Sequence, residues 1–359
     1  MPLSRVNPWS SIIELEEEPL SKRAWVLQER YLATRTLHIA STQMYFECRS
    51  GFYPQNRHMR HKDSQEDFKI HRRDTAQGNA KPTDAWKDIV RRYANRSLTV
   101  ESDKLTAIGG LAARVFLERG LTNSPGEEYL AGLWRKDLLW DLVWQTWTGD
   151  LKRSTPTSYT APSWSWASIN GPIAFLESQS IHRPSDIQSL ALMKGAKVDL
   201  ESSESPFGRV TSGWVHLSGI KIYPCDVEED GDLWFREGDG RFRLHTDMDP
   251  SRFGLPEVHL ADYMDKKSEL VVVPLTLHYE LVGADYKDED PAPGAYFLIL
   301  ISSTSGGGLT DGLLCFRRVG VGTSYMEELR GNDNNARRRL QNRCMEAMVQ
   351  GTLEDIIIV

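Results

Sequence analysis

The polar residues of the segment RAWVLQER are the first candidates for chemistry, because they place Arg23, Gln28 and Glu29 beside Trp25. A carboxylate near a guanidinium and an amide can act as a general acid or base, or it can make polar contacts with a partner. Arg23 and Glu29 are six residues apart in the sequence, so they do not form the close pair of helix positions i and i+4. We interpret them as charges of a half-buried helix that pair with a neighbouring strand, since structural ion pairs outnumber catalytic ones.

A second group, made of Cys48, His58, His61 and His71, has the residue types that bind zinc. Nine, two and nine residues separate its members, whereas structural zinc sites use paired short spacings. The surrounding segment is rich in Arg and Lys, which would repel a cation. The sequence therefore predicts no metal, and we expect a solvated basic loop that could contact an acidic partner.

Tryptophans form the remaining motifs, and Trp164-Ser165-Trp166 is the densest of them. Alternation predicts a strand with both rings on one side. We expect a core pair that packs on the helix expected over 134–147, rather than a platform that stacks a base or a ligand, because no basic stripe surrounds it. Trp25, Trp134, Trp164 and Trp166 are thus interpreted as structural.

Recognisable catalytic motifs are missing from the sequence. It has no G-x-S-x-G and no H-E-x-x-H, and the glycines at 306–308 lack the Lys-Ser/Thr of a phosphate-binding loop. We therefore predict no catalytic residue and no cofactor.

The apolar pattern predicts an α+β protein with a mainly helical N-terminal half, followed by an antiparallel β-rich module with a C-terminal helix. In the first half we expect a helix over 21–30, strands over 36–39 and 44–48, a helix that begins at Thr83, another that begins at Ser102 or Asp103, and a helix over 136–146. Strands are expected over 191–199, 210–223, 232–235, 241–245, 270–282, 295–302 and 312–319, then a helix over 336–348 and a strand over 356–359 that returns to a sheet.

Composition restricts the setting of the protein. The chain has 359 residues, a net charge of −7 and four separated cysteines, which predict free thiols in a reducing compartment. A mildly acidic chain has no general attraction for nucleic acid. No apolar run approaches the ~20 residues that a spanning helix needs, and no signal peptide is visible. We expect a cytoplasmic protein that binds neither nucleic acid nor membrane.

The blocks at 23–40 (RAWVLQERYLATRTLHIA) and 161–168 (APSWSWAS) resemble the fungal heterokaryon incompatibility (HET) family, and SDKL at 102–105 and YLAGLW at 129–134 match it in order. The resemblance implies a role in non-self recognition and programmed cell death, as an interaction or signalling module with a protein partner, such as another HET-type subunit. The HET domain has been likened to TIR-type domains, some of which cleave NAD with a glutamate. The alternatives are therefore a residual NAD or nucleotide hydrolase that uses Glu29, and an inert truncated fragment.

The resemblance also implies a division of the chain. HET domains carry two further blocks upstream of RAWVLQER, with core strands and a characteristic acidic residue, and this sequence begins just before the third block. We therefore expect a C-terminal remnant of a HET domain over 1–48, a polar loop or insertion over 49–82, a helical Trp-rich extension over 83–184, and an antiparallel β module with a closing helix over 185–359. Because the catalytic part is expected to be absent, binding rather than catalysis is predicted.

Overall fold

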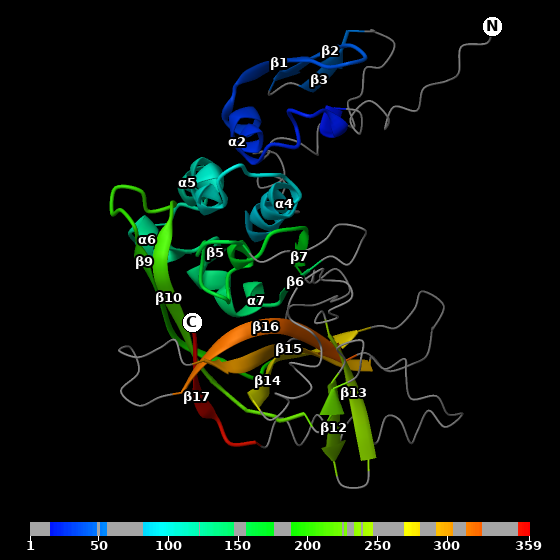
Figure 1. The fold of residues 1–359 in the computed structure, drawn as a ribbon, viewed down its shortest axis with the longest axis vertical. Helices are drawn as coiled ribbons and strands as arrows, with labels where there is room; N and C mark the ends of the chain where they lie inside the picture. The colour runs from blue at the N-terminus through cyan, green and yellow to red at the C-terminus, as the bar shows by residue number, and fades with distance from the viewer. Residues whose placement is uncertain are drawn as a thin grey trace, which may run out of the picture. The chain divides into compact units, whose positions relative to one another are not determined.

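The structure is a computed structural model of the 359-residue chain. It describes residues 15–48, 51–55, 82–121, 123–146, 156–175, 188–224, 226–227, 233–237, 240–246, 269–280, 292–303, 314–324 and 351–359, whose elements Figure 1 labels. The chain divides into two compact units. Unit 1 comprises Met1–Tyr129 and Glu201–Arg209, and unit 2 comprises Leu130–Leu200 and Val210–Val359.

Unit 1 combines helices with a small antiparallel sheet. Its longer helices are α2 (Ala24–Leu32), α4 (Pro82–Ala94) and α5 (Thr106–Glu118), with shorter pieces at η2 (Glu101–Asp103) and α6 (Pro125–Glu128). The strands β1 (Arg35–Ile39), β2 (Met44–Cys48) and β3 (Gly51–Pro54) pair in the order β1-β2-β3. Glu18 anchors the β1–β2 turn, since one of its oxygens accepts from Ser41 N at 2.7 Å and from Ser41 Oγ at 2.6 Å.

Helix α4 follows the predicted apolar pattern. Trp86, Ile89, Val90 and Tyr93 are all buried, as expected for positions i, i+3, i+4 and i+7 of one helical face. Helix α5 begins three residues later than the expected cap at Asp103, because residues 101–103 form the separate turn η2. The predicted strands at 36–39 and 44–48 are confirmed as β1 and β2.

Unit 2 is dominated by a ten-stranded sheet. Its strands are β8 (Gln188–Ser189), β9 (Leu192–Leu200), β10 (Val210–Gly219), β11 (Asp226–Val227), β12 (Leu233–Glu237), β13 (Gly240–Thr246), β14 (Leu270–Glu280), β15 (Ala292–Ser303), β16 (Cys315–Ser324) and β17 (Glu354–Ile358). All pairs given for this sheet are antiparallel except β16 with β17, so the sheet is mixed. Leu270 to Val273 are buried without alternation, which places β14 between covered faces.

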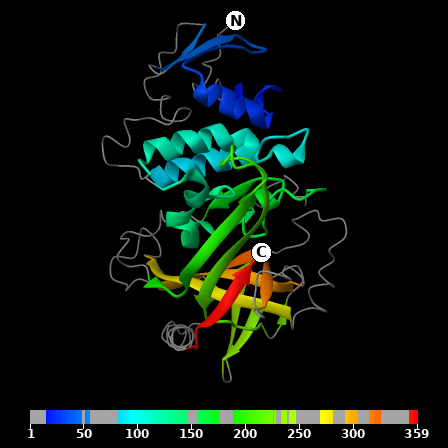
Figure 2. The same ribbon diagram turned by 90° about the vertical axis from the view of Figure 1, so that its left-hand side faces the viewer.

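The C-terminal strand confirms one sequence prediction. The predicted strand at 356–359 corresponds to β17, which pairs with β10, seen in Figure 2 as the red strand beside a green one. Ile356 and Ile358 are fully buried there, so the apolar end of the chain does not form an open sheet edge. The predicted helix at 336–348 lies outside the described residues.

The expected mainly helical N-terminal half is wrong. Over the described part of the whole chain strand residues outnumber helical ones, and the first half itself contains the strands β1 to β7 between its helices. Short elements fill its second part: β4 (Tyr129–Leu130), β5 (Leu133–Trp134), η3 (Arg135–Asp137), α7 (Leu138–Asp141), β6 (Trp144–Thr146), η4 (Trp166–Ser168) and β7 (Ile173–Phe175). The β-rich character of the C-terminal half is confirmed, although as a mixed rather than purely antiparallel sheet.

Three local predictions for the first half of the sequence are wrong. The expected helix over 136–146 is one turn of α-helix followed by strand β6, and the expected strand at Trp164–Trp166 is a turn leading into η4. Residues 51–54, placed in a polar loop, form β3. The first two segments are buried on several sides, and an apolar run without a polar face carries no periodicity from which to choose helix or strand.

Candidate functional site

Helix α2 carries the RAWVLQER residues and buries one side of them in unit 1. Ala24, Leu27 and Arg30 are buried at positions i, i+3 and i+6, which lie on one side of a helix. Arg30 is therefore a charged residue on the apolar side. A buried guanidinium is unfavourable unless acceptors surround it, so its partners define the polar centre of this unit.

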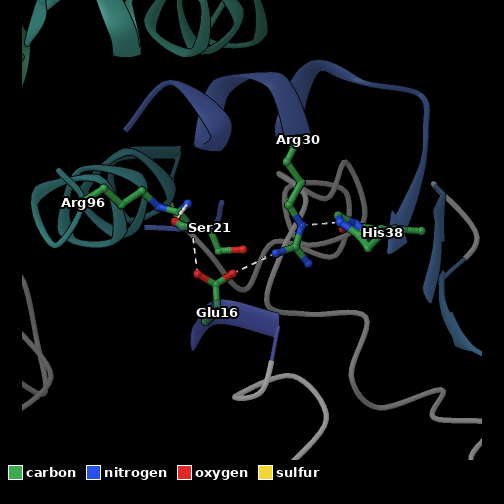
Figure 3. Close-up of polar contacts among 6 residues, drawn as sticks. Glu16, Ser21, Arg30, His38 and Arg96 are labelled. Atoms are coloured by element: carbon green, nitrogen blue, oxygen red, sulfur yellow. Dashed lines mark hydrogen bonds and ion pairs between the residues drawn. The ribbon is translucent and has the colours of Figure 1, made fainter. Parts of the chain in front are cut away.

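Arg30 joins two carboxylates, and Figure 3 shows its contact with Glu16 and its position beside His38. Its Nε donates to Glu47 Oε2 at 2.7 Å, and its Nη1 donates to Glu16 Oε1 at 2.8 Å. His38 on β1 places its Nε2 at 2.8 Å from the same Glu47 oxygen. Because a carboxylate oxygen accepts, the shared proton lies on His38 Nε2. Glu47 on β2 thus joins the sheet to α2 through Arg30, and it joins β2 to β1 through His38.

Glu16 extends this connection to the end of α4. Arg96 Nη2 donates to Glu16 Oε2 at 2.8 Å, and Arg96 Nη1 donates to the carbonyl oxygen of Ser21. Burial lowers the pKa of Arg96, and the negative charge of Glu16 opposes that change. We call the series His38–Glu47–Arg30–Glu16–Arg96 the ion-pair chain.

The geometry of the ion-pair chain is that of a structural cluster. The side chains of Arg30 and Glu47 are only 5% and 4% exposed, and each carboxylate is bound by two basic side chains. A general acid or base must reach a substrate, whereas Glu47 is enclosed and faces its partners. The cluster therefore holds α2, the sheet and the α4 end together.

The predicted polar residues occupy the outer parts of α2. Arg23 and Glu29 are exposed, and Trp25 is half-buried. Gln28 is half-buried, and its Oε1 accepts from the backbone nitrogen of Gly110 on α5 at 2.6 Å. A Cβ at Gly110 would lie 2.7 Å from that oxygen, so a larger residue there would push the Gln28 side chain aside. Gln28 therefore joins two helices, and the structure does not bring Arg23 and Glu29 into a common site.

The three-stranded sheet has two different faces. The inner face carries Tyr45 and Glu47, both buried, and Tyr45 stacks on Phe52 with ring centroids 5.0 Å apart. The opposite side, which we call the outer face, is apolar and exposed. Its residues and exposed fractions are Leu37 (60%), Ile39 (80%), Met44 (39%), Phe46 (41%) and Tyr53 (44%).

Register gathers the outer-face residues into one patch. Leu37 lies opposite Phe46, Phe46 opposite Tyr53, and Ile39 opposite Met44. The Phe46 and Tyr53 ring centroids are 6.3 Å apart. Five contiguous large apolar side chains on one sheet face differ from the singly scattered apolar residues of ordinary surfaces. Patches of this kind mark interaction sites.

Three of the four tryptophans interpreted as structural are buried in unit 2, where Trp134, Trp164 and Trp166 are each at most 1% exposed, whereas Trp25 is half-buried in unit 1. Trp166 Nε1 donates to the carbonyl of Gly132 at 3.0 Å, and Ser165 Oγ donates to the carbonyl of Ala131 at 2.5 Å. Segments 129–134 and 161–168, both part of the family resemblance, therefore bind each other directly. They form a core, with no ring surface open to a base.

The 102–105 segment is also held inside unit 1. Lys104 is 5% exposed, and burial lowers its pKa from 10.5 to about 7, opposed by the charge of Glu101. Its carbonyl accepts from Tyr93 Oη at 2.6 Å, and Asp103 accepts from Arg209 Nη2 at 2.6 Å. These contacts are structural. Because folding lowers the pKa of Lys104, the free energy of unfolding should depend on pH through this residue.

Sequence reasoning missed the members of the ion-pair chain. Two signals were present. Arg30 continues the three-residue spacing of Ala24 and Leu27, and Glu47 lies two residues after Tyr45, on the same side of a predicted strand. The distant partners Glu16 and Arg96 carry no such signal, because eighty positions separate them.

Among the described residues, no group of His, Cys, Asp and Glu side chains could hold a metal ion. Of the group with zinc-binding residue types, His58, His61 and His71 lie outside the part of the chain that the structure describes, and Cys48 is a half-buried free thiol. No helix in the described part of the chain is long and apolar enough to cross a membrane. Comparison with protein-family models, with curated proteins and with solved structures gave no match.

Proposed function

We propose that this chain is a protein-interaction module of the heterokaryon incompatibility type, acting in the cytoplasm in fungal non-self recognition and cell-death signalling. The resemblance of the blocks at 23–40 and 161–168 supports the biological role. The outer face supports the mode of action, because a contiguous exposed apolar patch costs solubility unless it binds something.

The polar residues of the same unit favour binding over catalysis. Glu29, the carboxylate considered for NAD hydrolysis, is exposed on α2, whereas catalytic carboxylates usually lie in a cleft. Glu47 and Glu16 are engaged with Arg30. These ion pairs stabilise the three-stranded sheet that carries the outer face.

The proposal is tested in fusing fungal hyphae that express the full chain. The variant carries Leu37→Lys and Phe46→Lys, and the matched control carries Leu117→Lys on α5, where the side chain is 73% exposed outside the sheet. We expect uptake of a membrane-impermeant dye in fused cells with the wild type and the control, and its loss with the outer-face variant. Equal dye uptake with the variant, or none with the wild type in any pairing, would refute the proposal.

A further inference from the structure

The outer face raises the question of which partner covers it, and this inference rests on the proposed function. We infer that its occupant is a second copy of the same chain, packed face to face across a two-fold axis. The contact would join the outer faces of two three-stranded sheets, with Phe46 at the centre of each.

The position of Phe46 makes the outer face suitable for self-association. Phe46 lies on the middle strand, flanked by Leu37 on β1 and Tyr53 on β3 in the same row. A two-fold axis that runs parallel to the sheet, just beyond its outer face at Phe46, places this ring against its counterpart. The flanking apolar side chains then lie around it, as in aligned packing of two sheets.

Charge is compatible with this arrangement. By alternation with Leu37 and Ile39, exposed Arg35 belongs to the outer side at one corner of β1, in the row of Cys48 and Gly51. If the two-fold axis runs along the strands, Arg35 meets the Gly51 position of the other copy. If the axis crosses the strands, Arg35 meets the Ile39 position. In neither orientation does Arg35 meet its counterpart, so the contact itself does not place the two guanidinium charges against each other.

The area fits a reversible dimer. The exposed parts of the five side chains amount to on the order of 500 Å² per copy, at the upper end for patches on monomeric proteins. Two copies would bury roughly 1,000 Å² in total, which is near the lower limit for a specific interface. The expected complex is therefore a weak dimer with a micromolar dissociation constant rather than an obligate one.

Sedimentation velocity of the full chain over a range of concentrations tests the inference. We expect the mass to rise from 40.8 kDa towards twice that value. Phe46→Lys should raise the dimer dissociation constant about tenfold or more, while Leu117→Lys leaves it unchanged. Phe46→Ser serves as a second variant should lysine disturb folding, which thermal melting of each variant monitors.

Oxidative footprinting locates the contact. Met44 and Phe46 should react more slowly with hydroxyl radicals at dimer concentrations than at monomer concentrations. A wild type that stays monomeric at all concentrations, or a dimer that Phe46→Lys leaves intact, would overturn the inference.

The outcomes separate this inference from the proposed function. A monomeric wild type whose cell-death response still requires the outer face would refute the second copy and retain an interaction module with a different protein partner. A dimer that depends on Phe46, combined with a cell-death response that does not, would retain the dimer and refute the proposed function.

Discussion

Removal of the Glu47 carboxylate should destabilise unit 1 strongly. Glu47→Ala deletes the acceptor of Arg30 Nε at 2.7 Å and of His38 Nε2 at 2.8 Å. Arg30 remains 5% exposed and keeps Glu16, whose side chain is 34% exposed, as its carboxylate partner in the ion-pair chain. A buried charge that loses its best partner costs about 3–5 kcal/mol of unfolding free energy.

Two comparisons separate this loss from general effects of mutation. Glu118→Ala removes a carboxylate that pairs with Arg114 at 2.6 Å, where the side chains are 24% and 42% exposed, and should cost only about 0.5 kcal/mol. The double variant Arg30→Met with Glu47→Leu should recover most of the loss. It removes both buried charges and fills their space, while Glu16 keeps Arg96 as its partner.

Urea unfolding followed by circular dichroism measures these free energies. Hydrogen exchange of peptides from α2 and β2 assigns the affected transition to unit 1. A loss for Glu47→Ala no larger than that for Glu118→Ala would refute the buried ion pair. A double variant as unstable as the single one would show that the loss arises from packing rather than from unpaired charge.

Three further outcomes are expected. The folded-state pKa of Lys104, about 7, lies below its unfolded value of 10.5, so the unfolded chain binds more protons between these two pH values. The free energy of unfolding should therefore rise with pH by roughly 1.4 kcal/mol per pH unit in this range. Lys104→Met should remove this rise, which urea titrations at several pH values measure. Gly132→Ala should lower the free energy of unfolding by about 3 kcal/mol, because φ is +97° and the new Cβ would lie 2.5 Å from Trp166 Nε1. Gly120→Ala should lower it by only about 1 kcal/mol, because φ is +62° and the space around the new Cβ is open. Thermal unfolding measures both losses. Gln28→Ala should cost about 1 kcal/mol through its lost hydrogen bond, and exposed Glu29→Ala should stay within about 0.5 kcal/mol.

For each of these three predictions, one experimental result would refute the reasoning. A stability profile of Lys104→Met that still rises as steeply as the wild type would place the titration elsewhere. Equal costs at Gly132 and Gly120 would remove the argument from crowding. If Glu29→Ala costs as much as Gln28→Ala, then the outer side of α2 makes contacts that its exposure does not suggest.

The sequence by itself determined the elements whose pattern is local. Trp86, Ile89, Val90 and Tyr93 repeat with the helical period because one side of α4 faces the interior. The strands β1 and β2 and the long strands of unit 2 were predicted for a similar reason, since short β-rich runs are separated by turn residues.

Local pattern failed where residues are buried from several directions. The segment around Trp144 and the pair Trp164 and Trp166 are apolar without a consistent polar side, so helical and strand periods fit equally well. Their conformation follows from distant contacts, such as Trp144 Nε1 donating to the Trp164 carbonyl at 2.9 Å. A window of sequence contains only one side of such a contact.

Only the tertiary structure decided the candidate site. The residue types of Arg30 and Glu47 are visible in the sequence, but their pairing across seventeen positions depends on how α2 meets β2. Both sides of β2 carry large residues, Tyr45 inward and Phe46 outward, so alternation alone leaves open which side is covered. Burial is a property of the neighbours that fold against a strand, and this is why the exposed outer face emerged from the structure and not from the sequence.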